Sequence, residues 1–277
     1  MTICIGLLCS DGAVVASDTQ IGAGDFKGGS TKIAAATSVD PSGKILKAVA
    51  FAGAGHFGNV EAIRPHICGA VTEALGEDHE SGARVFNAIT NVLVPFNHIH
   101  NPAYGRDGCS RDFDILVATW TAGAGMLWAT DGTAVRPSVD FDAIGIGGSY
   151  ANEYLTALYH RGPIESGVLL ASYVMMRTTN IVRDCGKEIQ IVTIKDGAGG
   201  YLPRPLVQEI ECMWEHNADL QKEQFHYAIG FHGNMDAVTT RLDFVASEFT
   251  RLRQSIKETI SSRYPACSYF KYTPLKQ

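Results

Sequence analysis

Several features that define common classes of protein are missing from this sequence or scarce in it. No apolar run approaches the roughly 20 residues that a membrane-spanning helix requires. Basic residues are outnumbered, with 23 Lys and Arg against 29 Asp and Glu, so the formal net charge is −6. Proteins that bind nucleic acids need basic patches for the phosphate backbone. The composition therefore argues against nucleic acid and against a membrane as partners.

The first residues also lack the basic segment, long apolar core and small-residue cleavage site of a secretory signal peptide. We therefore expect a cytoplasmic protein. The seven cysteines are scattered and form no Cys-x-x-Cys pair, which predicts reduced, mostly buried thiols rather than a disulfide framework or a zinc site. The pair His98-Ile-His100 lies in a polar segment without further ligands nearby, and such histidines are usually solvated. No metal and no cofactor are expected.

What is present is the balance of a globular protein, with 45% apolar and 19% charged residues among 277. Apolar runs on both sides of Asp11-Gly12 predict a β-hairpin within residues 2–19. The glycine-rich segment 21–30, the polar segment 98–111 and residues 197–200 are predicted to be connections. Strands are predicted at 31–36, 45–52, 114–121, 125–130, 138–145 and 189–194, and helices at 59–75, 82–94, 150–159 and 164–181. Segregated runs of this kind predict an α+β fold, with antiparallel sheets and helices stacked outside them.

The last 75 or so residues differ in character, because they are charged and helical in period. They predict two further helices, at 206–223 and 235–262, followed by a short aromatic tail with Tyr269, Phe270 and Tyr272. The sequence therefore predicts a main domain over residues 2–203 and a C-terminal helical extension over residues 204–277.

The dipeptide Met1-Thr2 suggests a catalytic nucleophile. A small second residue permits removal of the first methionine, which would give Thr2 a free α-amine. Such a threonine supplies both a nucleophilic hydroxyl and its own general base. The predicted hairpin brings Asp18 back beside Thr2, and Lys32 follows as a candidate cation. Each of these residues has an ordinary structural explanation on its own, but together they favour a catalytic group.

The stretches Thr2-Ile-Cys-Ile-Gly, Ala16-Ser-Asp-Thr-Gln20 and Lys27-Gly-Gly-Ser-Thr-Lys32 resemble the N-terminal half of proteasome β subunits and, more closely, the bacterial proteasome-like peptidase that works with a AAA+ unfoldase. This family belongs to the N-terminal nucleophile hydrolases, whose fold is a four-layer αββα sandwich. The resemblance covers about residues 2–200. It implies that Thr2 is the nucleophile, that Asp18 and Lys32 are its catalytic partners, and that Lys27 matches a second basic residue.

The resemblance further implies that the backbone N–H of Gly53 helps to form an oxyanion hole. Phe51 would lie at the floor of the specificity pocket, with Ile21, Ser30 and Ala34 on its walls, so an uncharged residue is expected before the scissile bond. Three positions depart from the family pattern. Ile146 replaces one serine, Cys185 replaces another beside the retained Gly186, and Val182 stands where the family has an aspartate, which is missing or shifted to Asp184.

The function expected from this resemblance is a threonine peptidase that acts on peptides or unfolded proteins within a homo-oligomer, with a AAA+ unfoldase as a further partner. Two alternatives remain at this point. An N-terminal nucleophile amidase would use the same Thr2 chemistry on a small molecule, and a structural subunit would keep the fold without activity. The joint presence of Thr2, Asp18 and Lys32 argues against the structural subunit, whereas Ile146 and Val182 argue for it.

Overall fold

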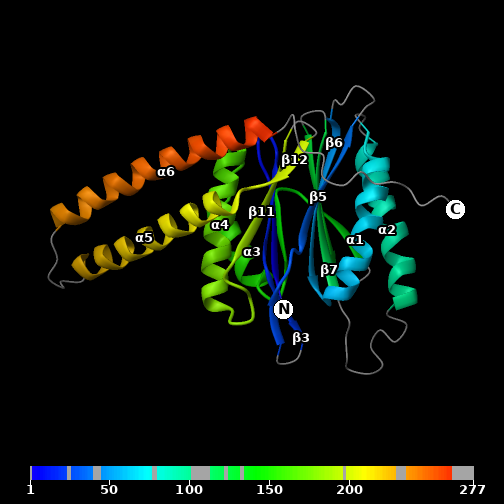
Figure 1. Ribbon diagram of the computed structural model, residues 1–277, viewed down its shortest axis with the longest axis horizontal. Helices are drawn as coiled ribbons and strands as arrows, with labels where there is room; N and C mark the ends of the chain where they lie inside the picture. Colours follow the sequence, from blue (N-terminus) through cyan, green and yellow to red (C-terminus); the bar gives the residue numbers. More distant parts are fainter. Residues whose placement is uncertain are drawn as a thin grey trace.

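A computed structural model gives the fold of the chain, whose described residues form two five-stranded antiparallel sheets and one separate hairpin (Figure 1). The structure describes residues 2–23, 26–39, 45–76, 80–100, 113–121, 124–131, 134–195, 198–228 and 235–263. The first sheet has the order β10 (Phe141–Gly145), β1 (Ile3–Leu8), β2 (Ala13–Asp18), β11 (Ile189–Lys195) and β12 (Ala198–Tyr201). The second has the order β5 (Ile33–Val39), β6 (Ile45–Gly55), β7 (Phe113–Thr121), β8 (Ala124–Asp131) and β9 (Ala134–Ser138). The hairpin is β3 (Gln20–Ala23) and β4 (Phe26–Gly29).

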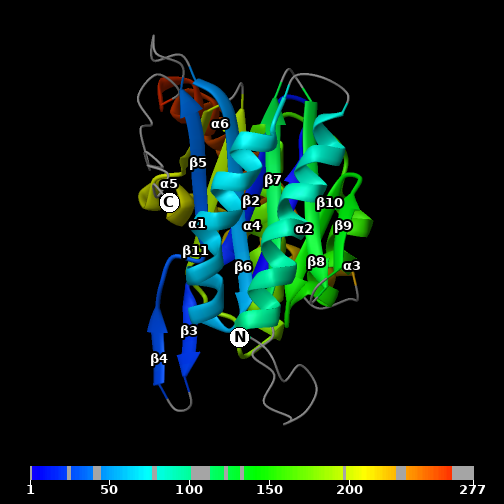
Figure 2. The same ribbon diagram turned by 90° about the vertical axis from the view of Figure 1, so that its right-hand side faces the viewer.

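Helices cover the outer faces of both sheets. The second sheet is covered by α1 (Phe57–Ala74) and α2 (Ser81–His100), which lie in front of it in Figure 2. The first sheet is covered by α3 (Gly148–Leu158) and α4 (Ile164–Ile181). Two more helices, α5 (Arg204–Ala228) and α6 (Met235–Arg263), follow. The order helix, sheet, sheet, helix confirms the αββα fold expected from the sequence.

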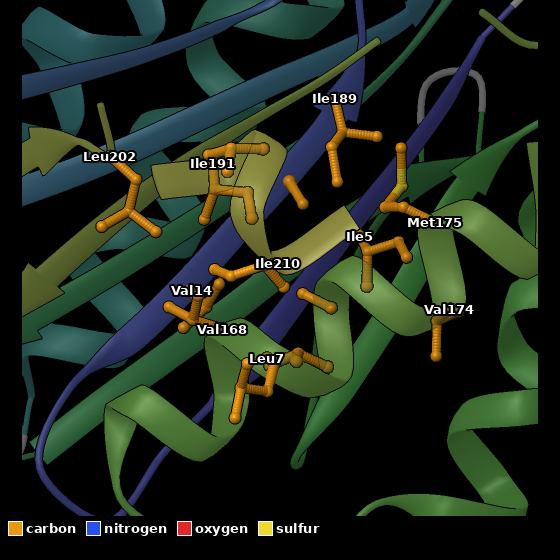
Figure 3. Close-up of a cluster of buried hydrophobic side chains, with 14 of the residues drawn as sticks. Ile5, Leu7, Val14, Val168, Val174, Met175, Ile189, Ile191, Leu202 and Ile210 are labelled. Carbon is orange, nitrogen blue, oxygen red and sulfur yellow. The ribbon is translucent and has the colours of Figure 1, made fainter. Parts of the chain in front are cut away.

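Side-chain alternation along β1 explains why this strand lies at the centre of the molecule. Ile3, Ile5 and Leu7 point to the helical layer of α4, whereas Cys4 and Leu8 point to the second sheet. Figure 3 shows Ile5 and Leu7 in the first of these two cores, among residues of α4 and β11. Because both faces are buried, the strand is apolar at almost every position. Removal of these side chains from water is the main stabilising contribution to this fold.

The boundaries of four predicted segments were wrong. The predicted loop 21–30 contains the β3–β4 hairpin, since pairing satisfies its backbone N–H and C=O groups. The single strand predicted over 138–145 is two strands, β9 and β10, which belong to different sheets. The turn predicted at 197–200 includes strand β12. Helix α2 continues to His100, so the loop predicted over 98–111 begins too early. Residues 101–112 lie outside the described residues.

The C-terminal helices extend away from the sheets as a long helical pair, drawn in yellow and orange in Figure 1. Their buried side chains nevertheless belong to the same core as β1 and α4: Leu206, Val207, Ile210, Leu220, Val245, Leu252, Ile256 and Ile260. Figure 3 shows Ile210 next to Val14 and Val168 in this core. The division into two domains at residue 203 stays a prediction. The aromatic tail of Tyr269, Phe270 and Tyr272 lies outside the described residues. Within the described ranges, no helix combines the length and apolar character needed to cross a membrane.

Asp11, in the turn between β1 and β2, caps a distant helix. Its Oδ1 accepts a hydrogen bond of 2.8 Å from the backbone N–H of Ile164, and its Oδ2 lies 2.6 Å from Lys195 Nζ. The N-cap residue of α4 is Pro163, which provides no side-chain cap. We expect Asp11→Ala to lower the free energy of unfolding by about 1–2 kcal/mol, as the loss of a helix cap does. Urea unfolding measures this, with Ser10→Ala on the exposed neighbouring residue as control; equal midpoints for the two variants would contradict it.

Candidate active site

Thr2, Asp18 and Lys32 meet at one end of the two sheets. Lys32 Nζ donates a hydrogen bond of 2.6 Å to Thr2 Oγ1 and another of 3.0 Å to Asp18 Oδ1. All three residues are buried, with exposed fractions of 4%, 0% and 2% respectively. The structure therefore brings the three predicted catalytic residues into direct contact, with the lysine between the hydroxyl and the carboxylate.

The Asp18 carboxylate is held by backbone groups as well as by Lys32. Its Oδ1 accepts from the backbone N–H of Ile3 at 3.0 Å. Its Oδ2 accepts from the backbone N–H of Gln20 at 3.2 Å and of Gly186 at 2.8 Å. A buried carboxylate is costly unless it is paired and hydrogen-bonded, and both conditions are met here. The carboxylate therefore fixes the position of Lys32 and joins the start of β1 to the segment before β11.

Lys32 lies just before β5, in a segment that is anchored on both sides. The Thr31 carbonyl accepts from Arg64 Nη1 of α1 at 3.4 Å, and the Thr31 hydroxyl accepts from Gln190 Nε2 of β11 at 3.3 Å. The Lys32 carbonyl accepts from the backbone N–H of Gly53 at 3.1 Å. These contacts restrain the lysine backbone, so little conformational freedom is lost when its side chain reaches Thr2.

Gly53 lies where a side chain does not fit, since an added Cβ would be 2.2 Å from Val60 Cγ1 of α1. Its N–H donates to Lys32, as described, and its carbonyl oxygen lies 3.4 Å from Cys4 Sγ. The oxyanion role of Gly53 stays a prediction, and it requires the N–H to be shared with, or released to, a developing oxyanion.

The four predicted pocket residues have different environments. Phe51 is fully buried and Ala34 exposes 8% of its surface, and both pack in the core beneath α1. Ser30 is half-buried, and its backbone N–H donates to the Thr19 carbonyl. The side chain of Ile21, like that of Lys27, lies outside the described residues. Phe51 and Ala34 thus lie in the core rather than on an exposed surface. The assignment of the specificity pocket stays a prediction.

The positions that depart from the family pattern differ in burial and in their place in the fold. Ile146 is exposed, Val182 ends α4, and Cys185 is buried. Burial, together with the nearby Asp18 carboxylate, raises the pKa of the Cys185 thiol to about 12. Because the thiolate is the reactive form of cysteine, Cys185 is not a competing nucleophile near neutral pH.

Gly145 contacts Thr2 directly, and this contact was not predicted from the sequence. It pairs with Ile3, its φ is +85°, and an added Cβ would lie 2.3 Å from the Thr2 carbonyl oxygen and 2.9 Å from Ala54 Cβ. The signal in the sequence is the run Gly145-Ile146-Gly147-Gly148 after a strand, because clustered glycines mark close approach of backbones. Ile3, Gln20 and Gly186, which act through backbone N–H groups, leave no side-chain signal.

We expect Gly145→Ala to lower the free energy of unfolding by about 1–3 kcal/mol, because alanine is strained at positive φ and its Cβ would collide with the Thr2 backbone. The displaced Thr2 should also react more slowly with acylating reagents. Thermal unfolding and intact mass after labelling measure the two effects. Gly29→Ala is a suitable control, since an added Cβ there meets nothing within 4 Å. A stable Gly145→Ala variant that reacts normally would show that this close contact is not required.

No metal centre is found among the described residues, where no group of three or more His, Cys, Asp or Glu side chains could hold an ion. His98 and His100 both lie in the last turn of α2 and are exposed. The groups that meet at Thr2 are a hydroxyl, an ammonium and a carboxylate. Such a group suits nucleophilic attack on a carbonyl carbon.

Comparison with known proteins supports the class of fold. No family model matches the sequence, and no curated protein is similar enough to match. Solved structures do match in fold. The matching structures include an ancestral beta-subunit, and their likeness to this chain shows the class of fold.

The particular proteins are forms of Anbu. A Gly-1 mutant of Anbu from Hyphomicrobium sp. strain MC1 has a TM-score of 0.61 at 14% identity, covering 81% of this chain and 97% of its own. Anbu, the ancestral beta-subunit, from Yersinia bercovieri has a TM-score of 0.59 at 14% identity, covering 84% and 99%. The helical assembly of the Anbu complex from Pseudomonas aeruginosa gives 0.59 at 15% identity, covering 80% and 96%. At these identities the likeness shows a shared fold.

Proposed function

We propose that this protein is a threonine peptidase whose nucleophile is Thr2, exposed as an N-terminal residue by cleavage of the preceding peptide bond. The observation that carries the proposal is the position of Lys32 Nζ, 2.6 Å from Thr2 Oγ1 and 3.0 Å from Asp18 Oδ1. A buried ammonium at this distance favours the partly negative oxygen that forms when the hydroxyl attacks. Cleavage before Thr2 supplies the amine, whose ordinary pKa of about 7.7–8.0 suits a general base.

The proposed reaction has two stages. Thr2 Oγ attacks the peptide carbonyl carbon while the Thr2 amine takes the hydroxyl proton. The carbon–nitrogen bond breaks, the leaving amine receives that proton, and an ester joins the substrate acyl group to Thr2. A water molecule then attacks the ester, with the amine again as base, and regenerates the free hydroxyl. An uncharged residue before the scissile bond fits the small or apolar predicted pocket residues, and release of p-nitroaniline or a coumarin from short peptides would test this preference.

Assembly and location form part of the same proposal. One of the similar structures is described as a helical assembly. We propose that this chain also forms a homo-oligomer in the cytoplasm, where it degrades peptides and unfolded chains delivered by a AAA+ unfoldase. Enclosure in an assembly would restrict an unselective peptidase to unfolded substrates. Analytical ultracentrifugation would measure the oligomeric state, and a monomer at micromolar concentration would contradict this part.

The test of the nucleophile is the intact mass of the purified protein before and after treatment with a peptide epoxyketone or a β-lactone. The expected result is a chain that begins at Thr2 and gains one adduct on that residue. Thr2→Ala should gain none. A chain that keeps residues before Thr2, or a free Thr2 that does not react, would contradict the proposal and favour a structural subunit. That alternative is supported by Ile146, an apolar residue where the family has a serine.

A peptidase and an amidase for small molecules would both form the adduct. Hydrolysis of an unfolded protein such as casein separates them, because an amidase site has no room for a polypeptide on both sides of the scissile bond. Cleavage of casein supports the peptidase, and cleavage of short amides alone supports the amidase.

A further inference from the structure

Three large apolar side chains are exposed at one rim of the candidate site. Ile146 exposes 49% of its surface, Tyr150 exposes 45% and Ile181 exposes 49%. We call these three residues the rim patch. Exposed apolar groups that are close together mark binding sites more often than isolated ones do.

The packing of α3 against α4 brings the three residues to the same end of this helix pair. The rings of Tyr154 and Tyr173 are 6.3 Å apart, and the Arg177 guanidinium lies 6.0 Å from the Tyr154 ring centre. Tyr150 lies one helical turn before Tyr154, and Ile181 lies one turn after Arg177. Since the helices are antiparallel neighbours, Tyr150 and Ile181 face the same end, where Ile146 lies in the turn that precedes α3.

The turn that carries Ile146 touches both the nucleophile segment and α4. As described above, Gly145 is in contact with the Thr2 backbone. On the other side of Ile146, a Cβ added to Gly147 would lie 3.0 Å from Ile3 Cβ and 2.9 Å from Thr178 Cγ2, in the last turn of α4. The rim patch is therefore continuous with the wall of the site rather than a separate surface.

In the first sheet, the rim patch and the segment that leads to the predicted specificity pocket lie on opposite sides of β1. In the first sheet, β1 is flanked by β2 on one side and by β10 on the other. Asp18 ends β2 and is followed by the segment that holds Ile21 and Ser30 of the predicted pocket, whereas the patch follows β10. A peptide whose acyl part occupies the pocket would direct its leaving part across Thr2 towards β10 and α3.

We propose that the rim patch binds an apolar side chain on the first residue after the scissile bond, on the leaving side of the substrate. This assignment rests on the proposed peptidase function and adds the substrate preference of the same site. An apolar side chain there would lose water-exposed area together with Ile146, Tyr150 and Ile181, which lowers the free energy of the bound state. An Asp or Lys side chain would instead lose hydration without a described partner in the patch.

The experiment compares internally quenched peptides with one fixed acyl half and with Leu, Phe, Asp or Lys as the first leaving-side residue. We expect kcat/KM to be about tenfold or more higher for Leu and Phe than for Asp and Lys, the size of effect that one apolar contact in a pocket gives. Ile181→Asp and Tyr150→Asp should reduce this ratio. Leu158→Asp should not, because Leu158 is similarly exposed, at 44%, but lies at the other end of α3.

A peptide epoxyketone carries no leaving-side residue and therefore separates the two proposals. We expect the Ile181→Asp and Tyr150→Asp proteins to form the Thr2 adduct at the wild-type rate, which also shows that they are folded. Normal adduct formation with equal cleavage of all four peptides, or an equal effect of Leu158→Asp, would overturn the assignment of the rim patch. Absence of the adduct on the wild-type protein would overturn the proposed peptidase function and the assignment with it.

Discussion

Replacing Lys32 by methionine should slow the reaction of Thr2 with an epoxyketone by about 10²–10⁴-fold, the usual size of a positioned acid–base contribution. Methionine keeps much of the length of the side chain but donates no hydrogen bond to Thr2 Oγ1. Thr2 Oγ1 then loses the cation that lies 2.6 Å away. In the proposed reaction this cation stabilises the negative charge that develops on the oxygen during attack. Intact mass as a function of time gives the rate of adduct formation.

Lys47→Met is the matched control for this prediction. Lys47 is also partly buried, but its Nζ donates to the Thr72 carbonyl near the end of α1, away from Thr2. We expect it to leave the labelling rate unchanged. A Lys32→Met protein that is folded by circular dichroism and reacts as fast as wild type would show that Lys32 has only a structural role.

Replacing Asp18 by asparagine should lower the free energy of unfolding by about 3–5 kcal/mol, because it leaves the Lys32 ammonium buried without its counter-charge. The asparagine amide group would also bring an N–H donor to a place where all four observed partners are donors. Urea unfolding at neutral pH measures the loss. The exposed pair of Asp219 and Lys222 offers the control, since Asp219→Asn should change stability by no more than about 1 kcal/mol.

Combining Asp18→Asn with Lys32→Met tests whether an unpaired buried charge causes the loss of stability. In Asp18→Asn with Lys32→Met no unpaired buried charge remains, so the double variant should be more stable than Asp18→Asn alone. A double variant that loses the sum of the two single effects would mean that the carboxylate and the ammonium contribute independently of each other.

Much of the site could be predicted because its first members are close in sequence. The Asp-Gly turn sets the register in which Cys4 faces Ser17, and this register brings the start of β1 to the end of β2. Asp18 and Thr2 then become neighbours whatever the rest of the chain does. Lys32 was predicted through its sequence context, and its hydrogen bonds place it beside Thr2 and Asp18, whereas its catalytic role stays a prediction.

The groups that were missed come from distant segments or act through their backbones. Gly186 was named as a retained family residue, but its contact was not predicted: its N–H reaches Asp18 across a separation of 168 residues. The alternation of side chains along β6 does predict on which face of the sheet Phe51 lies. Phe51 shares a strand face with Val49, whereas Ala50 and Ala52 face the other sheet. The position of Phe51 beneath α1 therefore follows from the two-residue alternation of a strand.

The pairing of the first strands has a consequence for protein synthesis. Strand β1 needs β10 beside it, and β2 needs β11, so the partners of the N-terminal hairpin are translated more than a hundred residues later. Until they leave the ribosome, the nascent chain carries Thr2 without the strand that packs against it and Asp18 without the Gly186 N–H. Contacts of such high sequence separation form late and slowly. A nascent chain thus holds Thr2 in an unassembled site, and the proposed peptidase activity should arise only once more than two-thirds of the protein has been released.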